Sequence, residues 1–225
     1  MTPALNPSQL AAYDRDGFIL VSGLIPSPVV RRAESTLWSS LELDPGERTG
    51  WPVGAQFRRQ THPDLLACYT PTLLQAVAQL AGEDLSTVPA PKAVTSIVGF
   101  PPVEPPEWKW PEPHIDHAIK EDGHRTFPRP FRVASMLFLN DVAPHGGGTI
   151  VWPGSHKKIE ALALSDRKRY DTMWALNLDL HHLTLTNPVE LQPRQGDILF
   201  YQHLCAHAGS ANATSRPRVA FNAKW

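Results

Sequence analysis

Apolar residues in the first third of the chain recur mostly at helical spacing. Ser8 can cap a short helix that ends near Asp14, and the apolar stretch after this helix has the β-branched and aromatic content of a strand. Ser27 followed by Pro28 predicts a helix start, because proline at the first helical position lacks only an N–H that would stay unpaired. Apolar side chains that share one face predict another helix over about residues 71–81. We expect these helices to brace a sheet.

From about Lys92 the pattern changes to short runs rich in β-branched and aromatic residues, separated by Gly, Pro, Asn and Asp. The runs are AVTSIVGF, FRVASMLFLND, GTIVW, PVEL, GDILFYQH and RVAFNAKW. This succession favours an all-β sandwich or barrel core over alternating βα units. The proline-rich segment FPPVEPPEWKWPEPH predicts a long extended loop. Neither a repeat nor a linker is visible, so we expect one domain over residues 1–225.

Composition is that of a folded globular protein rather than a disordered one. The 225 residues are 42% hydrophobic and 19% charged, and the formal net charge of −1 gives no basic footprint for nucleic acid or an anionic membrane. Two cysteines, Cys68 and Cys205, allow one disulfide in principle but exclude a disulfide-stapled scaffold. The first residues lack the pattern of a signal peptide, and no stretch approaches the roughly 20 apolar residues of a membrane span. A cytoplasmic location is expected.

His114 and Asp116 are separated by one residue, so on a strand they share one side. Two histidines and one carboxylate are the ligands that hold non-haem Fe(II) on one face and leave the opposite face open. The triplet is a weak signal by itself, because chance produces it often. Its position strengthens it, since it stands at the end of the proline-rich segment and before a strand-rich region that contains further histidines.

The third ligand has rivals among the ten histidines. His203 and His207 are four residues apart, so on a regular strand both face the same side and either can reach a metal. Zinc with Cys205 is an alternative, but no paired CxxC unit accompanies this cysteine, which favours a buried thiol. Arg218 follows His207 by eleven residues and offers a fixed fork for the carboxylate of an organic acid. Together these residues suggest iron, O2 and a 2-oxo acid.

The C-terminal segment GDILFYQHLCAHAGSANATSRPRVAF resembles the closing strands of the phytanoyl-CoA dioxygenase family. In that family a Gly-Asp turn opens a strand, the distal iron histidine follows the aspartate by ten residues, and an oxoglutarate-binding arginine follows the histidine by eleven. Asp197, His207 and Arg218 have this spacing. The segments GGGTIVWPGSHKK and YDRDGFILVSGLIPSPVV resemble the glycine-rich approach and the usual opening of the family.

The resemblance implies a mainly β fold with flanking helices around a double-stranded β-helix, a jelly-roll or cupin-like core. It also implies that His114, Asp116 and His207 bind Fe(II), and that Arg218 binds the distal carboxylate of 2-oxoglutarate, with O2 as the second cosubstrate. Thr149 and Trp152 stand at positions that often line the oxoglutarate pocket in this family. An ordinary place in a packed strand is an equal alternative for both.

The implied activity is an oxygenase that hydroxylates or desaturates a C–H bond of a small metabolite, in natural-product or secondary metabolism, with release of succinate and CO2. Halogenating relatives replace the carboxylate at the position of Asp116, so its presence argues for an oxygen-linked outcome. Gly209 stands where the family often has Ser, and no basic surface for a CoA nucleotide is evident. Two alternatives remain, a non-catalytic metal-binding module and a cupin-like metalloenzyme that uses no oxo acid.

Substrate recognition has its own candidates. Trp108 and Trp110, with the segment that follows them, can form a lid over the iron, or they can simply pin the loop to the sheet. The nearby arginines that can pair with an anionic group of a substrate are Arg125, Arg129 and Arg132.

Overall fold

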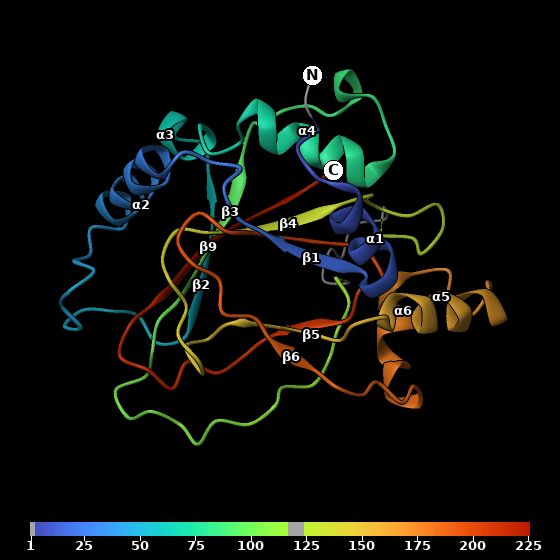
Figure 1. The fold of residues 1–225 in the computed structure, drawn as a ribbon. Coiled ribbons are helices and arrows are strands. Elements are labelled where there is room, and N and C mark those ends of the chain that lie inside the picture. Colours follow the sequence, from blue (N-terminus) through green and yellow to red (C-terminus); the bar gives the residue numbers. More distant parts are fainter. Residues whose placement is uncertain (1–2, 117–123) are drawn as a thin grey trace.

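Two antiparallel sheets form the centre of the molecule in a computed structural model, which describes residues 3–116 and 124–225 (Figure 1). The six-stranded sheet contains, in spatial order, β1 (Phe18–Val21), β7 (Ile198–Tyr201), β4 (Ala134–Phe138), β9 (Arg218–Lys224), β3 (Val94–Gly99) and β2 (Ala55–Gln60). The three-stranded sheet contains β6 (Val189–Glu190), β5 (Thr149–Val151) and β8 (His207–Gly209). The mainly β class with flanking helices and a double-stranded β-helix core is confirmed.

Helices cover the outer face of each sheet. Figure 1 shows the first group, which packs over the six-stranded sheet: α1 (Pro7–Asp16), α2 (Ser27–Leu41), α3 (Pro63–Leu66) and α4 (Pro71–Ala81). The second group lies beside the smaller sheet: α5 (Ser155–Ser165), α6 (Met173–Leu178) and the short 3-10 helix η2 (Leu180–His182). A further 3-10 turn, η1, spans Leu85–Thr87.

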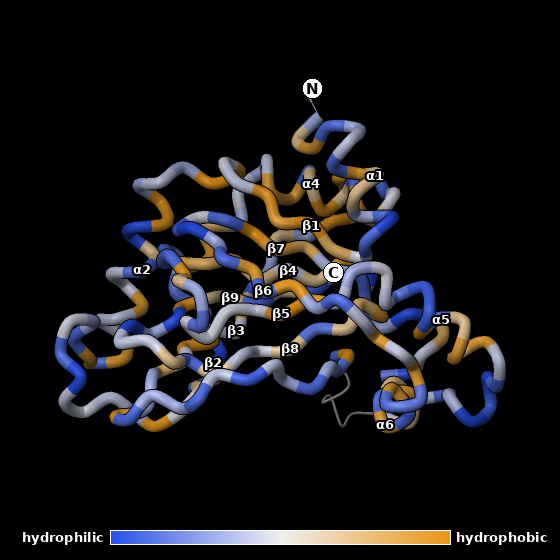
Figure 2. Tube along the Cα trace, turned by 60° about the horizontal axis from the view of Figure 1, so that its bottom comes forward, coloured by the Kyte–Doolittle hydropathy of each residue, from blue (hydrophilic) through white to orange (hydrophobic). Residues whose placement is uncertain are grey.

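Alternation along the strands divides the apolar residues between the outer and inner faces of the large sheet. In β4, Ser135 and Leu137 face the helices α1 to α4, whereas Met136 and Phe138 face the smaller sheet. All five residues of β4 are buried, because the strand is covered on both faces. The edge strand β1 is also apolar along much of its length in Figure 2. Most side chains that face the space between the sheets are therefore apolar.

Several local predictions are confirmed, and one is wrong. The helix expected over about residues 71–81 spans Pro71–Ala81, and α2 begins at Ser27 as expected. Ser8 is not the cap of α1. Asn6 accepts a hydrogen bond from the Gln9 backbone N–H at 3.0 Å while the Gln9 side chain accepts from the Asn6 N–H at 2.8 Å, a reciprocal capping box that places Ser8 inside the first turn.

Neither cysteine is in a disulfide, since Cys68 and Cys205 are both buried free thiols. The one disulfide that the sequence allows in principle is therefore not formed. Burial raises the pKa of each thiol to about 12, so both stay protonated at neutral pH. Within the described ranges, no helix combines the length and the apolar character that crossing a bilayer requires.

Truncation of a core leucine tests the packing of the helices on the large sheet. Leu73 of α4 is 0% exposed, so we expect Leu73→Ala to lower the free energy of unfolding by about 2–5 kcal/mol through lost burial and a cavity. Leu164 of α5 is 46% exposed, and we expect Leu164→Ala to change it by less than about 0.5 kcal/mol. Urea unfolding measures both values. Equal losses in the two variants would contradict the packing described.

Candidate iron site

A backbone bridge brings together two of the residues proposed from the sequence. The His114 N–H donates to the His207 carbonyl, and the His207 N–H donates to the His114 carbonyl, each at 2.9 Å. Residues directly opposite each other in an antiparallel pair have side chains on the same face. The two imidazole rings are accordingly neighbours, with 4.6 Å between their centroids. Asp116 completes the group, because its Oδ1 lies 3.7 Å from His207 Nε2.

Apolar neighbours force these side chains to face the interior. Ile115, Ala206 and Ala208 alternate with the polar residues, and all three are buried in the cluster formed with α5 and α6 on the outer face of the smaller sheet. Because side chains alternate along a strand, burial of these three on the outside turns His114, Asp116 and His207 inward.

His207 is held in one orientation. Its Nδ1 lies 2.9 Å from the Cys205 carbonyl oxygen, and a carbonyl oxygen only accepts. Nδ1 therefore donates, which leaves Nε2 of the neutral ring with its lone pair facing Asp116. This is how proteins orient a metal-binding histidine, because the second ring nitrogen fixes both the tautomer and the direction of the ring.

Asp116 is held through its other oxygen. Its Oδ2 accepts hydrogen bonds from the Tyr201 hydroxyl and from Lys224 Nζ, each at 3.1 Å. Tyr201 in turn accepts from the Asn222 amide at 3.0 Å. Two donors thus occupy Oδ2, and Oδ1 is left beside His207. Three of these residues, Tyr201, Asn222 and Lys224, were not among the candidates from the sequence.

The charges of this group compensate one another. Burial alone would raise the pKa of Asp116, but the neighbouring His207 imidazole and the Lys224 ammonium group hold that pKa well below its usual range. Burial likewise acts to lower the pKa of His207, and the Asp116 carboxylate outweighs burial and raises it. A carboxylate and an oriented imidazole inside the barrel are donors that fit Fe(II).

Arg218 is a buried cation on the same inner face. It begins β9 opposite Gly99 of β3, it is 7% exposed, and its Nε has no hydrogen-bond partner among the described residues. Burial lowers the pKa of its guanidinium to about 10, so the group stays charged at neutral pH. A buried charge without a partner is unfavourable. A carboxylate that reaches this guanidinium would relieve the cost, so Arg218 fits an organic acid.

Thr149 and Trp152 lie on opposite faces of the smaller sheet. Thr149 shares the face of Val151, which pairs with His207, and its buried Oγ1 has no hydrogen-bond partner in the described part of the chain. Trp152 instead packs with Ile150 in the outer cluster against α5 and α6. The structure brings Thr149 toward the inner group and does not bring Trp152 there.

The proline-rich loop is anchored by Trp108. The Trp108 ring stacks on His145, with 4.2 Å between centroids and 19° between planes, whereas Trp110 is 53% exposed. This contact agrees with a tryptophan that pins the loop. The segment after Asp116, which the lid hypothesis also used and which includes the rival His117, lies outside the described residues in part.

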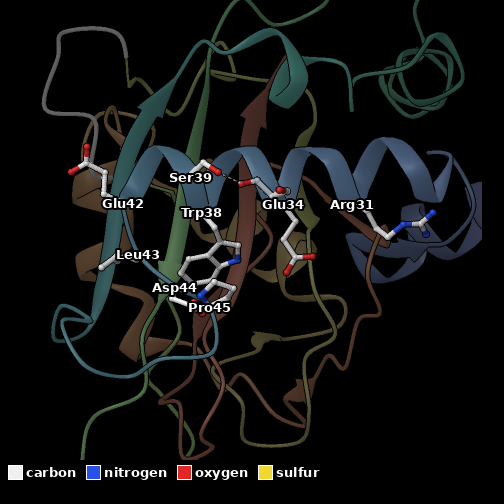
Figure 3. Close-up of a pocket in the computed structure, with 9 residues that line it drawn as sticks. Arg31, Glu34, Trp38, Ser39, Glu42, Leu43, Asp44 and Pro45 are labelled. Atoms are coloured by element: carbon white, nitrogen blue, oxygen red, sulfur yellow. Dashed lines mark hydrogen bonds between the residues drawn. The ribbon is translucent and has the colours of Figure 1, made fainter.

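Two other features are separate from this group. Among the described residues, Asp179, His181 and His182 have ligand atoms within 4.8 Å of one another, but Asp179 already accepts from Arg169 and Tyr170. A hollow of about 650 Å³ lies along α2, where Glu34 and Trp38 extend from the same side of the helix (Figure 3). It opens on the helical side of the large sheet, away from the interior.

The fold, together with His114, Asp116 and His207 on its inner face, is consistent with one class of protein. The family model for phytanoyl-CoA dioxygenase (PhyH) matches residues 13–220. The chain therefore belongs to the phytanoyl-CoA dioxygenase family, whose members are iron- and 2-oxoglutarate-dependent oxygenases. A comparison with curated protein sequences finds no significant match.

Solved structures with the same fold are iron- and oxoglutarate-dependent enzymes. The epimerase SnoN from nogalamycin biosynthesis has a TM-score of 0.64 at 17% identity, covering 96% of this chain and 79% of its own. The carbocyclase SnoK from nogalamycin biosynthesis has a TM-score of 0.63 at 18% identity, with 98% and 84% covered. EctD from S. alaskensis, solved with 2-oxoglutarate and 5-hydroxyectoine, has a TM-score of 0.60 at 19% identity, with 98% and 76% covered.

Removal of the Tyr201 hydroxyl tests how Asp116 is held. We expect Tyr201→Phe to weaken Fe(II) or Co(II) binding by about tenfold, because Asp116 loses one of the two donors that orient it. Tyr170→Phe is the matched control, since Tyr170 donates to Asp179 in the outer cluster at 3.0 Å. Anaerobic calorimetric titration gives both affinities. Wild-type affinity in Tyr201→Phe, or an equal loss in both variants, would contradict the assignment.

Proposed function

We propose that His114, Asp116 and His207 hold Fe(II) and that Arg218 binds the distal carboxylate of 2-oxoglutarate. The observation that carries this proposal is the placement of the buried Arg218, whose Nε has no hydrogen-bond partner among the described residues, on the inner face that also bears the Asp116–His207 pair. One group offers ligands for a divalent cation and the other requires an anion, which is the combination that an iron-chelating dicarboxylate satisfies.

Iron with bound 2-oxoglutarate supplies the activation of O2 and the oxidation of a C–H bond, with release of succinate and CO2. The residues of the chain position the participants. The Cys205 carbonyl holds the His207 ring, and Tyr201 with Lys224 keeps Oδ2 of Asp116 occupied so that Oδ1 binds the metal. Arg218 fixes the far end of the cosubstrate, and Thr149 Oγ1 is free to add a hydrogen bond to it.

The apolar wall of the interior limits competing reactions with water. Met136, Phe138 and Leu199 face the space between the sheets and are at most 7% exposed. In such surroundings the ion pair of Asp116 with Lys224, and a pair between Arg218 and a bound carboxylate, are stronger than in water.

We further propose that the substrate is a small metabolite oxidised by hydroxylation or desaturation in natural-product or secondary metabolism. The carboxylate of Asp116 supports an oxygen-linked outcome. Two structural neighbours, SnoN and SnoK, are enzymes from nogalamycin biosynthesis, and this supports the proposed metabolic role. A cytoplasmic location is also proposed, supported by the two free thiols.

Anaerobic addition of Fe(II) and 2-oxoglutarate is expected to produce a weak visible charge-transfer band. Asp116→Ala and His207→Ala should abolish the band, because each removes a ligand from the three. Absorbance spectroscopy under argon measures it, and admission of O2 should then release succinate from the intact protein. Intact protein that shows neither the band nor succinate would overturn the proposal, as would an unchanged band in both variants.

Arg218→Gln is expected to raise the Kd for 2-oxoglutarate by about 30-fold or more. Loss of one partner of a buried charge pair costs about 2–5 kcal/mol, which corresponds to at least that factor. Arg216→Gln is the matched control, because Arg216 is exposed and stands two residues away. Titration of the visible band gives the Kd. If the protein is instead a cupin-like enzyme that needs no oxo acid, neither substitution should change the titration with 2-oxoglutarate, and that result would contradict the proposal.

A further inference from the structure

A second pocket, of about 330 Å³, lies between α1, α4 and the loop after β7. Its lining includes Tyr13, Arg129, Arg132 and His203, and the exposed residue Asp14 also contributes to it. The volume suits part of a small molecule.

Among the described residues that line this pocket, three buried polar atoms have no hydrogen-bond partner: the Tyr13 hydroxyl, His203 Nε2 and Arg132 Nε. Tyr13 is 5% exposed, and neither its hydroxyl nor Nε2 of His203 has a hydrogen bond to any described residue. Each such group costs about 1–3 kcal/mol when it stays unpaired. The neighbouring Gln202 differs, because its amide donates to the Tyr13 carbonyl at 3.4 Å. Tyr13 and His203 are therefore available to a ligand in the pocket.

The arginines near the pocket are not equivalent. Arg132 pairs with Glu83 at 2.7 Å, and Arg125 pairs with Asp171 at 3.2 Å. Arg129 lines the pocket and has no ion pair in the described part of the chain. Of the three arginines considered from the sequence, Arg129 is thus the one without an ion pair to another described residue.

The pKa of His203 shows the effect of the positive charge of Arg129 beside it. Burial, the Arg129 charge and His156 together lower the pKa of His203 to about 4, so its ring is neutral at physiological pH. A neutral ring can donate from one nitrogen, and the Tyr13 hydroxyl is a second donor. Two donors and one unpaired guanidinium form a set that accepts an anionic oxygen group.

The pocket is connected to the proposed iron ligand Asp116 through the side chains of Phe131 and Lys224. The Phe131 ring contacts the His203 ring edge-on, with 6.2 Å between centroids, and Lys224 Nζ lies 4.9 Å from the Phe131 centroid. Lys224 is the residue that donates to Asp116 at 3.1 Å. One aromatic side chain therefore stands between the pocket and the residues that hold Asp116, which is a distance that a small substrate can span.

We propose that Tyr13, Arg129 and His203 bind a carboxylate or phosphate group carried by the molecule that is oxidised at the iron site. The claim that this ligand is the substrate rests on the proposed function, whereas the claim that the pocket binds an anion does not. The class of substrate is then a small acid with an apolar body, whose anionic group is held at Arg129 and whose remainder passes Phe131 toward Asp116.

Binding is tested on the full-length, metal-free protein by NMR of the ¹⁵N-labelled histidine rings, with His203→Gln to assign the signal. Inorganic phosphate and phenylacetate are expected to shift the His203 signal with Kd values in the millimolar range, and uncharged methyl phenylacetate is not. Arg129→Gln and Tyr13→Phe should weaken the response at least about fivefold. Arg125→Gln and Arg218→Gln should respond as wild type does.

Tyr13→Phe removes a hydroxyl without a described partner, so we expect it to fold normally. Absence of a saturable shift, an equal response to methyl phenylacetate, or an unchanged response in Arg129→Gln would each overturn the pocket. A site filled by an adventitious ion alone would bind phosphate and not phenylacetate, which would overturn the substrate class.

A second readout separates the pocket from the proposed function. Phenylacetate at saturation of the pocket is expected to shift the visible band of the protein loaded with Fe(II) and 2-oxoglutarate, because its ring would lie against Phe131, whose neighbour Lys224 holds Asp116. A band that ignores phenylacetate would show that the pocket serves another ligand and would overturn the substrate claim. If the band never forms, the proposed function fails, while the NMR titration still decides whether the pocket binds anions.

Discussion

The backbone pairing of His114 with His207 is the contact on which the arrangement of the site depends. Two hydrogen bonds of 2.9 Å join segments that are far apart in the chain and fix their register. A slip of one residue would turn His114 and Asp116 outward and bring Ile115 inward. The register is secured by burial of Ile115 and Ala206 in the outer cluster. Apolar packing outside the barrel thus determines the polar chemistry inside it.

The interior contains buried charges, and a buried charge is stable only when a partner of opposite charge or a hydrogen bond compensates it. Lys224 and Tyr201 compensate Asp116, and their hydrogen bonds leave one carboxylate oxygen available. Arg218 has no such compensation within the described residues. Among the described residues of the interior, Asp116 is therefore a compensated anion and Arg218 a cation without a compensating partner. The uncompensated Arg218 lowers the stability of the folded protein. A cosubstrate carboxylate that binds Arg218 would supply the missing partner, which explains why a functional site retains such a residue.

Much of the fold could be predicted from residue patterns, and the failures have physical causes. The strand AQFRRQ of β2 was missed because it is an edge strand with few apolar residues, and β8 has only three residues. His114 and Asp116 could be found from their spacing, whereas the choice between His203 and His207 needed the family spacing. Lys224 was missed because β9 is buried on both faces, so alternation alone does not tell which side chains face the metal.

The most direct test of the central claim is an anaerobic crystal structure of the protein with Fe(II) and 2-oxoglutarate. The account predicts iron bound by His114, by Oδ1 of Asp116 and by Nε2 of His207, with the distal carboxylate of 2-oxoglutarate on Arg218. Iron bound at Asp179, His181 and His182 instead, or 2-oxoglutarate bound away from Arg218, would contradict it.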